Sequence, residues 1–176
     1  LPFSFTGFSP SGGFWTGVGV IDSTGVFDPA VAGIGTHVVT YTYFNTVTGC
    51  FNINAKEVTV NALPIVDAGA DIEICNTTAN YTLNPGSPAG GFWSGPGLVN
   101  ANNGIFNSVL AGGIGSYTLT YNYTDGNGCE NTDQLVVDVV MPPTVNAGPD
   151  INVCIDEGII TLSGNSPLGG TWSGTG

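Results

Sequence analysis

Basic residues are almost absent from this chain of 176 residues. Lysine and arginine together contribute one residue, Lys56, against thirteen acids, and the formal net charge is −12. A surface that binds nucleic acid or an anionic membrane needs many Lys and Arg side chains, because these replace the counterions at phosphates. The composition therefore excludes both classes of partner.

Residues that favour helices are also scarce. Lys, Arg, Glu, Gln and Met together number 7, whereas Val, Ile and Thr contribute 18, 12 and 20 residues. β-branched side chains fit pleated strands well and lose rotamer freedom in helices. The 28 glycines and 11 prolines supply turns between strands. We therefore expect an all-β protein.

Long apolar runs and an opening signal segment are missing too. No apolar run approaches the ~18 residues of a membrane-spanning helix, so no membrane insertion is expected in this segment. The chain does not open with a charged and then apolar export signal, so we expect any such signal to lie outside this stretch. Disorder is excluded because 41% of the residues are hydrophobic.

The sequence does contain a repeat with a period close to 79 residues. The segment PIVDAGADIEIC (64–75) returns as PTVNAGPDINVC (143–154). The segment SPAGGFWSGPG (87–97) has counterparts in SPSGGFWTGVG (9–19) and SPLGGTWSGTG (166–176). Because the matches keep their order over the whole period, they indicate tandem duplication.

The register of the matches predicts three domains, residues 1–63, 64–142 and 143–176. Only the middle repeat contains the whole pattern, because the first lacks the opening strands and the third stops after its tryptophan motif. We expect the chain to be a window on a longer polymer of the same unit. Short linkers that contain proline favour a semi-rigid rod, since proline fixes φ.

Within the middle repeat, turn signals and period-2 alternation predict about seven short antiparallel strands and no helix. The clearest strand runs from Tyr117 to Thr124, and a Gly-rich turn leads to a return strand that ends at Val140. The residues expected to face inward on these two strands are Tyr117, Leu119, Tyr121, Tyr123, Leu135, Val137 and Val139. This pattern is typical of an immunoglobulin-type β-sandwich, so we predict tandem sandwiches arranged end to end.

The run GGIGSYTLTYNYTDGNGC (112–129) resembles the last hairpin of PKD-type immunoglobulin-like domains. The Trp-Asp-Phe-Gly-Asp-Gly motif of that family is replaced here by Gly-Gly-x-Trp-Ser/Thr-Gly. The combination is similar to the tandem repeats of large Bacteroidetes surface adhesins, including those of gliding motility that the type IX secretion system exports. The resemblance implies an extracellular, cell-surface protein whose partners are adjacent repeats, surface glycans or other adhesin chains.

A tryptophan recurs in each repeat between glycines, as Trp15, Trp93 and Trp172. These indoles could form an exposed platform for sugar stacking, or they could be core residues packed between the sheets. A residue found at the same place in every repeat most simply serves what every repeat needs, which is folding. We therefore predict that all three are structural core residues.

Two tyrosines of the strongest strand complete the predicted core. Tyr121 lies on its inward face, and Tyr117 takes the place of the tyrosine corner of immunoglobulin-like domains. The first repeat has His37 at the position of Tyr117. Because the chain has no second histidine, no imidazole cluster can bind zinc, and we interpret His37 as a polar substitute for the corner tyrosine.

The four cysteines occupy two positions of the repeat. Cys75 and Cys129 are the two within the complete repeat, so we predict a disulfide between them. In a loop-entropy model such a bond is worth ~4 kcal/mol, and it implies an oxidising compartment. Cys50 and Cys154 would then have partners outside this chain.

Acidic side chains are candidate calcium ligands near the start of the middle repeat and around its last turn. They are Asp67, Asp71, Glu73, Asp125 and Asp133. However, no D-x-D-x-D-G loop is present, and the third repeat has Asn146 and Asn152 in place of two of these acids. A solvated acidic surface is therefore the preferred interpretation, and no cofactor is expected.

Catalysis is not expected either. A Ser-His-Asp triad would need the single His37, and the sequence has no G-x-S-x-G motif. Asp22-Ser23-Thr24 resembles the short motif at which Bacteroidetes attach O-glycans, which makes Ser23 a candidate glycosylation site.

We expect a structural stalk segment of a repetitive surface adhesin, which acts as a semi-rigid spacer and projects an adhesive region from the cell. The alternative is a carbohydrate-binding β-sandwich that contacts sugars through its tryptophans or through residues 100–104. Lateral pairing of exposed strand edges is a third possibility.

Overall fold

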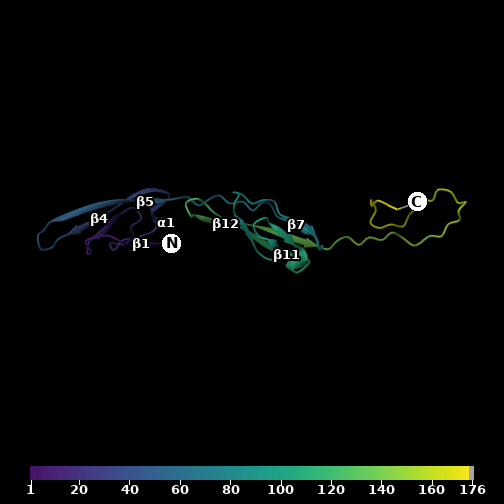
Figure 1. Ribbon diagram of the computed structural model, residues 1–176, viewed down its shortest axis with the longest axis horizontal. Helices are drawn as coiled ribbons and strands as arrows, with labels where there is room; N and C mark the ends of the chain where they lie inside the picture. The colour runs from purple at the N-terminus through teal and green to yellow at the C-terminus, as the bar shows by residue number, and fades with distance from the viewer. Residues whose placement is uncertain (175–176) are drawn as a thin grey trace. The chain divides into compact units, whose positions relative to one another are not determined.

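The computed structural model describes residues 1–174 and is all-β (Figure 1). Its contacts group the residues into two compact units. Unit 1 contains residues 1–67, 86–91 and 121–133, and unit 2 contains the remaining described residues. Across residues 1–174, no helix is long and apolar enough to cross a membrane.

The first sixty residues form two small sheets in unit 1. Strands β1 (Phe3–Ser4) and β3 (Val26–Phe27) pair with each other. Strands β2 (Phe14–Gly17), β4 (Gly35–Phe44) and β5 (Phe51–Val60) form a second sheet in the order β2-β4-β5. The long strands β4 and β5 lie side by side over ten residue pairs (Figure 1). Strand β5 is therefore an edge strand.

Aromatic side chains fill the core between these strands. Phe5, Trp15, Phe27, Val39 and Tyr41 are all buried. The rings of Phe5 and Trp15 lie 4.6 Å apart between centroids, and those of Phe5 and Phe27 lie 5.8 Å apart. Val39 and Tyr41 are two residues apart on β4 and therefore point to the same, inner side, because successive side chains of a strand point to opposite sides.

Residues 72–140 contain seven strands, the number expected for the middle repeat. Strands β6 (Ile72–Cys75), β12 (Glu130–Val140), β11 (Gly115–Thr124) and β8 (Phe92–Ser94) form a four-stranded sheet in that order. Strands β7 (Asn80–Thr82), β10 (Ile105–Asn107) and β9 (Leu98–Asn100) form a three-stranded sheet. The fully antiparallel arrangement was a wrong prediction, because β6 runs parallel to β12.

The inner faces of the two sheets approach each other within unit 2. Phe106 of β10 is fully buried, and its ring centroid lies 6.1 Å from that of Tyr117 of β11. Leu135, Val137 and Val139 of β12 are buried, which confirms the alternation predicted for the return strand. Several sheets with this kind of apolar interior are consistent with a β-sandwich.

Two single-turn helices interrupt the strands, although the sequence predicted none. They are α1 (Pro29–Ala32) and α2 (Ser108–Ala111). The Asp28 carboxylate accepts a hydrogen bond from the amide of Ala30, and the Asn107 side chain accepts one from the amide of Leu110. These N-caps satisfy backbone amides that the first turn of a helix leaves without a partner. A single helical turn therefore forms where the sequence predicted a non-helical connection.

After Val140 the chain runs to residue 174 without a strand (Figure 1). An isolated β-bridge joins Asn146 to Ser166, as a similar bridge joins Asp67 to Ser87. Ile151 and Val153, which follow this bridge position, are each 53% exposed.

Candidate functional site

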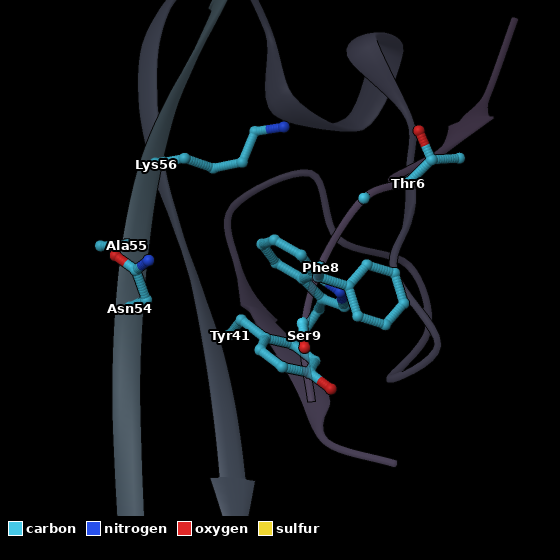
Figure 2. A pocket seen from close by; sticks show the side chains of 9 residues that line it. Thr6, Phe8, Ser9, Tyr41, Asn54, Ala55 and Lys56 are labelled. Carbon is cyan, nitrogen blue, oxygen red and sulfur yellow. The ribbon is translucent and has the colours of Figure 1, made fainter. Parts of the chain in front are cut away.

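A pocket of about 410 Å³ opens beside the aromatic core of unit 1 (Figure 2). One side is the loop of residues 6–9, and the other is residues 54–56 of β5. Trp15 and Tyr41 line the pocket between these two segments. The pocket therefore lies where β5 meets the loop that precedes β2.

Three aromatic rings form the apolar wall of this pocket. The Phe8 ring packs edge-on against Trp15 at 5.7 Å and lies 4.9 Å from the Tyr41 ring. The Trp15 and Tyr41 rings are 5.1 Å apart. Such tilted and edge-on pairs are favourable arrangements for aromatic rings, so the wall is held in place by its own packing.

The polar groups of the pocket are mostly neutral. The indole N–H of Trp15 is buried and has no hydrogen-bond partner among the described residues. The Lys56 ammonium lies 4.5 Å from the centroid of the Phe5 ring, a cation–π contact. Figure 2 shows Lys56 extending from β5, and it labels Thr6, Ser9 and Asn54 among the neutral polar side chains. Aromatic rings and neutral polar groups therefore line the pocket together, with Lys56 as its one charged side chain.

Tyr41 fixes the loop that leads into β2. Its hydroxyl accepts a hydrogen bond from the Gly13 amide at 2.8 Å and donates one to the Pro10 carbonyl at 2.5 Å. Tyr121 makes the same pair of bonds, with the Gly91 amide at 2.9 Å and the Pro88 carbonyl at 2.8 Å. The peptide bonds before Pro10, Pro88 and Pro167 are all cis. Each tyrosine thus joins a long strand to the loop before the tryptophan strand. We call this loop, residues 10–13 and 88–91, the tryptophan loop.

Removing the hydroxyl in Tyr41→Phe is expected to lower the free energy of unfolding by about 1–3 kcal/mol, because the Gly13 amide loses its acceptor in a partly buried place. Urea denaturation followed by fluorescence measures the loss. The control is Tyr43→Phe, because the Tyr43 hydroxyl makes no hydrogen bond within residues 1–174. Equal losses in the two variants would contradict the role of the Tyr41 hydroxyl.

The structure gives Tyr117 and His37 matching contacts. The Tyr117 hydroxyl donates to the Gly113 carbonyl at 3.0 Å, and Nε2 of His37 lies 2.8 Å from the Gly33 carbonyl. Each side chain therefore reaches the carbonyl four residues before it. This geometry is what the interpretation of His37 as a substitute for the tyrosine requires.

The three repeated tryptophans do not share one environment. Trp15 is 6% exposed and Trp93 is 2% exposed, whereas Trp172 is 49% exposed. The prediction of a buried Trp172 is therefore wrong in this structure. The physical reason is that Trp15 packs against Tyr41 of β4, and residues 141–174 contain no strand that could cover Trp172 in the same way.

The predicted disulfide is also wrong, because Cys75 and Cys129 are free thiols, as are the other two cysteines. Cys75 lies opposite Val140 at the end of β12, whereas Cys129 directly precedes the start of that strand. An eleven-residue strand is about 36 Å long at ~3.3 Å per residue. A disulfide requires Cα atoms about 4.4–6.8 Å apart.

The acidic residues make separate contacts with the backbone. Asp71 accepts a hydrogen bond from the Val136 amide at 2.7 Å, and Asp125 accepts from the amides of Asn127 and Cys129 at 2.8 and 2.9 Å. Within the described residues, no group of three or more His, Cys, Asp or Glu side chains could hold a metal ion. These two carboxylates therefore act locally, in turn and strand contacts.

The last turn of the middle repeat is expected to weaken in acid. The Cys129 amide, and then the amide and side chain of Asn127, lower the pKa of Asp125 from its ordinary value of 3.8. Because the folded-state pKa is the lower one, the stabilisation is complete above pH ~4 and is lost as the pH falls through the folded-state pKa. An NMR titration of the carboxyl carbon should give a pKa below 3.8. Asp125→Asn should abolish this titration, and a value above 3.8 in the wild-type chain would contradict the prediction.

Ser23 is exposed in the turn that precedes β3. Its carbonyl accepts a hydrogen bond from the Trp15 amide at 3.0 Å. One oxygen of Asp22 accepts from Thr24, Gly25 and Val26, and the Thr24 hydroxyl is the largest cause of the lowered pKa of Asp22. The turn is thus held by its backbone and by Asp22, and the side chain of Ser23 remains accessible as a candidate glycosylation site.

Several residues of the pocket were not singled out in the sequence. Phe5, Phe8 and Lys56 line or adjoin it, whereas the repeat pattern pointed to Trp15 alone in this region. The closely spaced phenylalanines of the opening segment were the available signal. No protein-family model matches the chain, and no curated protein matches it.

Proposed function

We propose that this chain is a structural stalk segment of a repetitive extracellular surface adhesin. In this proposal each immunoglobulin-like repeat is a semi-rigid spacer that adds length between the cell and an adhesive region. The partners of each repeat are the adjacent repeats of the same chain, with other adhesin chains or surface glycans at the distal region.

One observation carries the proposal: in both strand-bearing repeats, the recurring tyrosine and tryptophan make contacts inside the repeat and are not displayed on its surface. The tyrosine bonds to the tryptophan loop occur in both, through Tyr41 and through Tyr121. Trp15 and Trp93 are buried. Because an indole that is at most 6% exposed leaves little of its face for a sugar ring, this burial favours a spacer over a lectin that uses these two tryptophans.

The expected length per repeat follows from strand geometry. The eleven residues of β12 span about 36 Å at ~3.3 Å each, so a repeat adds roughly this length when strands run along the stalk. Proline at the joints, as in Pro142 and Pro143, restricts φ and disfavours free swivelling.

Small-angle X-ray scattering can test the spacer role. The chain is compared with a version that carries one inserted copy of residues 64–142, and the maximum dimension should increase by roughly 30–40 Å. Replacing Pro142 and Pro143 by glycine is the matched control and should broaden the distance distribution. A maximum dimension that does not increase with the added copy would refute the proposal, as would glycan binding that quenches the tryptophan fluorescence of the unaltered chain.

A further inference from the structure

The outer face of the sheet β2-β4-β5 carries an apolar patch. Phe14 of β2, Phe44 of β4, and Phe51 and Ile53 of β5 are 43%, 49%, 69% and 58% exposed. Phe44 lies opposite Phe51, and Phe14 and Ile53 each lie opposite Thr42. Residues directly opposite each other in a sheet project from the same face, as do residues two apart on one strand. We therefore call Phe14, Phe44, Phe51 and Ile53 the outer patch.

The outer patch lies on the side of the sheet away from the core. Trp15 of β2 and Val39 and Tyr41 of β4 are buried in the aromatic core. Successive side chains of a strand point to opposite sides, so the neighbours Phe14 and Thr42 point away from that core. The internal packing of the first repeat therefore does not use the outer patch.

The complete middle repeat leaves the corresponding face uncovered. Phe92 begins β8 as Phe14 begins β2, and it is 49% exposed. The counterparts of the other three patch residues lie at the end of β11 and the start of β12. They are Thr124, Glu130 and Thr132, and all three are exposed. Because residues before and after the middle repeat are both present, this face is open in the repeat itself, whatever stretch adjoins it.

The apolar character of the patch distinguishes the first repeat from the middle one. Two phenylalanines and an isoleucine occupy positions at which the middle repeat has two threonines and a glutamate. A residue that folding requires in every repeat recurs, as the buried Trp15 and Trp93 do. Since most of the outer patch does not recur, folding does not require it. Exposed apolar patches of this kind mark interaction surfaces.

Charge indicates the kind of partner that the outer patch fits. The chain has a formal net charge of −12, but Glu57 is the one charged residue that points outward from β2, β4 and β5. It lies four residues beyond Ile53, about 13 Å along the strand. The turn 45–50 at the near end of the patch has no charged side chain. The outer patch therefore offers a charged partner no ion pair, whereas a second outer patch can approach it without two carboxylates meeting.

The exposed area suits a weak pair of identical faces. At about 150–250 Å² for a whole aromatic side chain, the three rings of the outer patch expose about 240–400 Å². Two patches would bury about 500–800 Å² through the rings alone. Ile53 and the threonines between the rings raise this area toward the ~1,000 Å² at which specific interfaces begin. A second copy thus supplies enough apolar area for reversible association and too little for a permanent dimer.

We propose that the outer patches of two copies of this chain pack face to face about a two-fold axis. The four patch residues of one copy lie against the same four residues of the other, so the interface is isologous and closes as a dimer. The two sheets lie about 10 Å apart, as packed sheets do. This interaction surface is an addition to the spacer role and does not depend on it.

Sedimentation velocity on the whole chain tests the pairing. The patch variant carries Phe44→Thr, Phe51→Glu and Ile53→Thr, which are the residues that the middle repeat has at the corresponding positions of its strands. It should dimerise at least about tenfold more weakly than the parent chain, because most of the exposed apolar area is removed. The control is Val31→Ser with Ile34→Ser, since both side chains are exposed outside the outer face, and it should dimerise like the parent chain.

A parent chain that stays monomeric at every concentration would overturn the proposal, even if it binds a neutral glycan through the same residues. So would a patch variant that has the circular dichroism of the parent chain and dimerises as strongly, or a control that weakens as much as the patch variant. Salt gives a further readout, because two acidic chains repel each other. Dimerisation should strengthen as the salt concentration rises from about 0.05 to 0.5 M, and a weakening would indicate ion pairs and overturn the proposal.

Chemical cross-linking tests the geometry in a chain whose four cysteines are replaced by serine. Thr42→Cys puts a thiol at the centre of the outer patch, and Asn54→Cys puts one on the opposite face of β5. A bismaleimide that spans about 10 Å should join two copies through position 42, seen as dimers on a denaturing gel. Asn54 is the more exposed of the two positions, so accessibility favours the control. Equal dimer yields from the two positions would overturn the face-to-face arrangement.

Discussion

Replacing Phe106 by alanine is expected to lower the free energy of unfolding by about 3–5 kcal/mol. The ring is fully buried and lies 6.1 Å from that of Tyr117 on the facing sheet. Gly97 also approaches it closely, since a Cβ on Gly97 would lie 2.7 Å from Cε2 of Phe106. The surroundings are tightly packed on both sides, so truncation should leave a cavity that they cannot fill by collapsing. Guanidinium denaturation followed by tryptophan fluorescence measures the loss.

The matched control for this variant is Phe51→Ala. Phe51 begins β5 and is 69% exposed, so its truncation removes little packing. A change within about 0.5 kcal/mol is expected, as for most surface substitutions. If both variants lost the same stability, the interior described between β10 and β11 would not be the core.

Gly91→Ala is expected to cost about 2–3 kcal/mol, because overpacking a tight contact forces backbone shifts. A Cβ at this position would lie 2.4 Å from the carbonyl oxygen of Asn122 and 2.6 Å from Cζ of Tyr121. The carbonyl belongs to β11 and cannot rotate away. Any shift would also pull the Gly91 amide away from the Tyr121 hydroxyl, which is its acceptor at 2.9 Å. Thermal unfolding followed by circular dichroism measures the cost.

Gly126→Ala is the control for this second variant. A Cβ on Gly126 would meet nothing within 4 Å, and the residue does not have a positive φ. Alanine there should leave stability unchanged or raise it by about 0.4–1 kcal/mol, because it restricts the unfolded chain. An equal loss in Gly91→Ala and Gly126→Ala would show that loss of glycine flexibility, and not the clash, is responsible.

The hairpin of β11 and β12 was largely predictable from the sequence. Alternating apolar residues predicted seven inward side chains on these two strands. Of these, Leu119, Tyr121, Leu135, Val137 and Val139 are buried, whereas Tyr117 and Tyr123 are half-buried. The signal is local, since the side-chain period of a strand is 2 and one face of this sheet is apolar. The match between His37 and Tyr117 was likewise visible as a repeat position, because both reach a carbonyl four residues back.

The errors share one physical cause, which is that they concern partners distant in the sequence. Spacing along the chain placed Cys75 and Cys129 in one repeat, but the parallel pairing of β6 puts Cys75 at the far end of β12. The tryptophan motif predicted burial for Trp172, but burial requires a covering strand, and residues 141–174 contain none. A motif specifies which contacts a residue can make, and the fold determines whether the partner is present.

The candidate site shows the same division. The aromatic residues of the pocket can be read from the sequence, but their arrangement around the pocket arises only when β5 lies beside β4. The sequence by itself determined the all-β class and the inward faces of β11 and β12, because these follow from composition and local periodicity. Only the tertiary structure decided that β6 pairs in parallel with the end of β12, because strand pairing depends on residues that meet across large sequence separations.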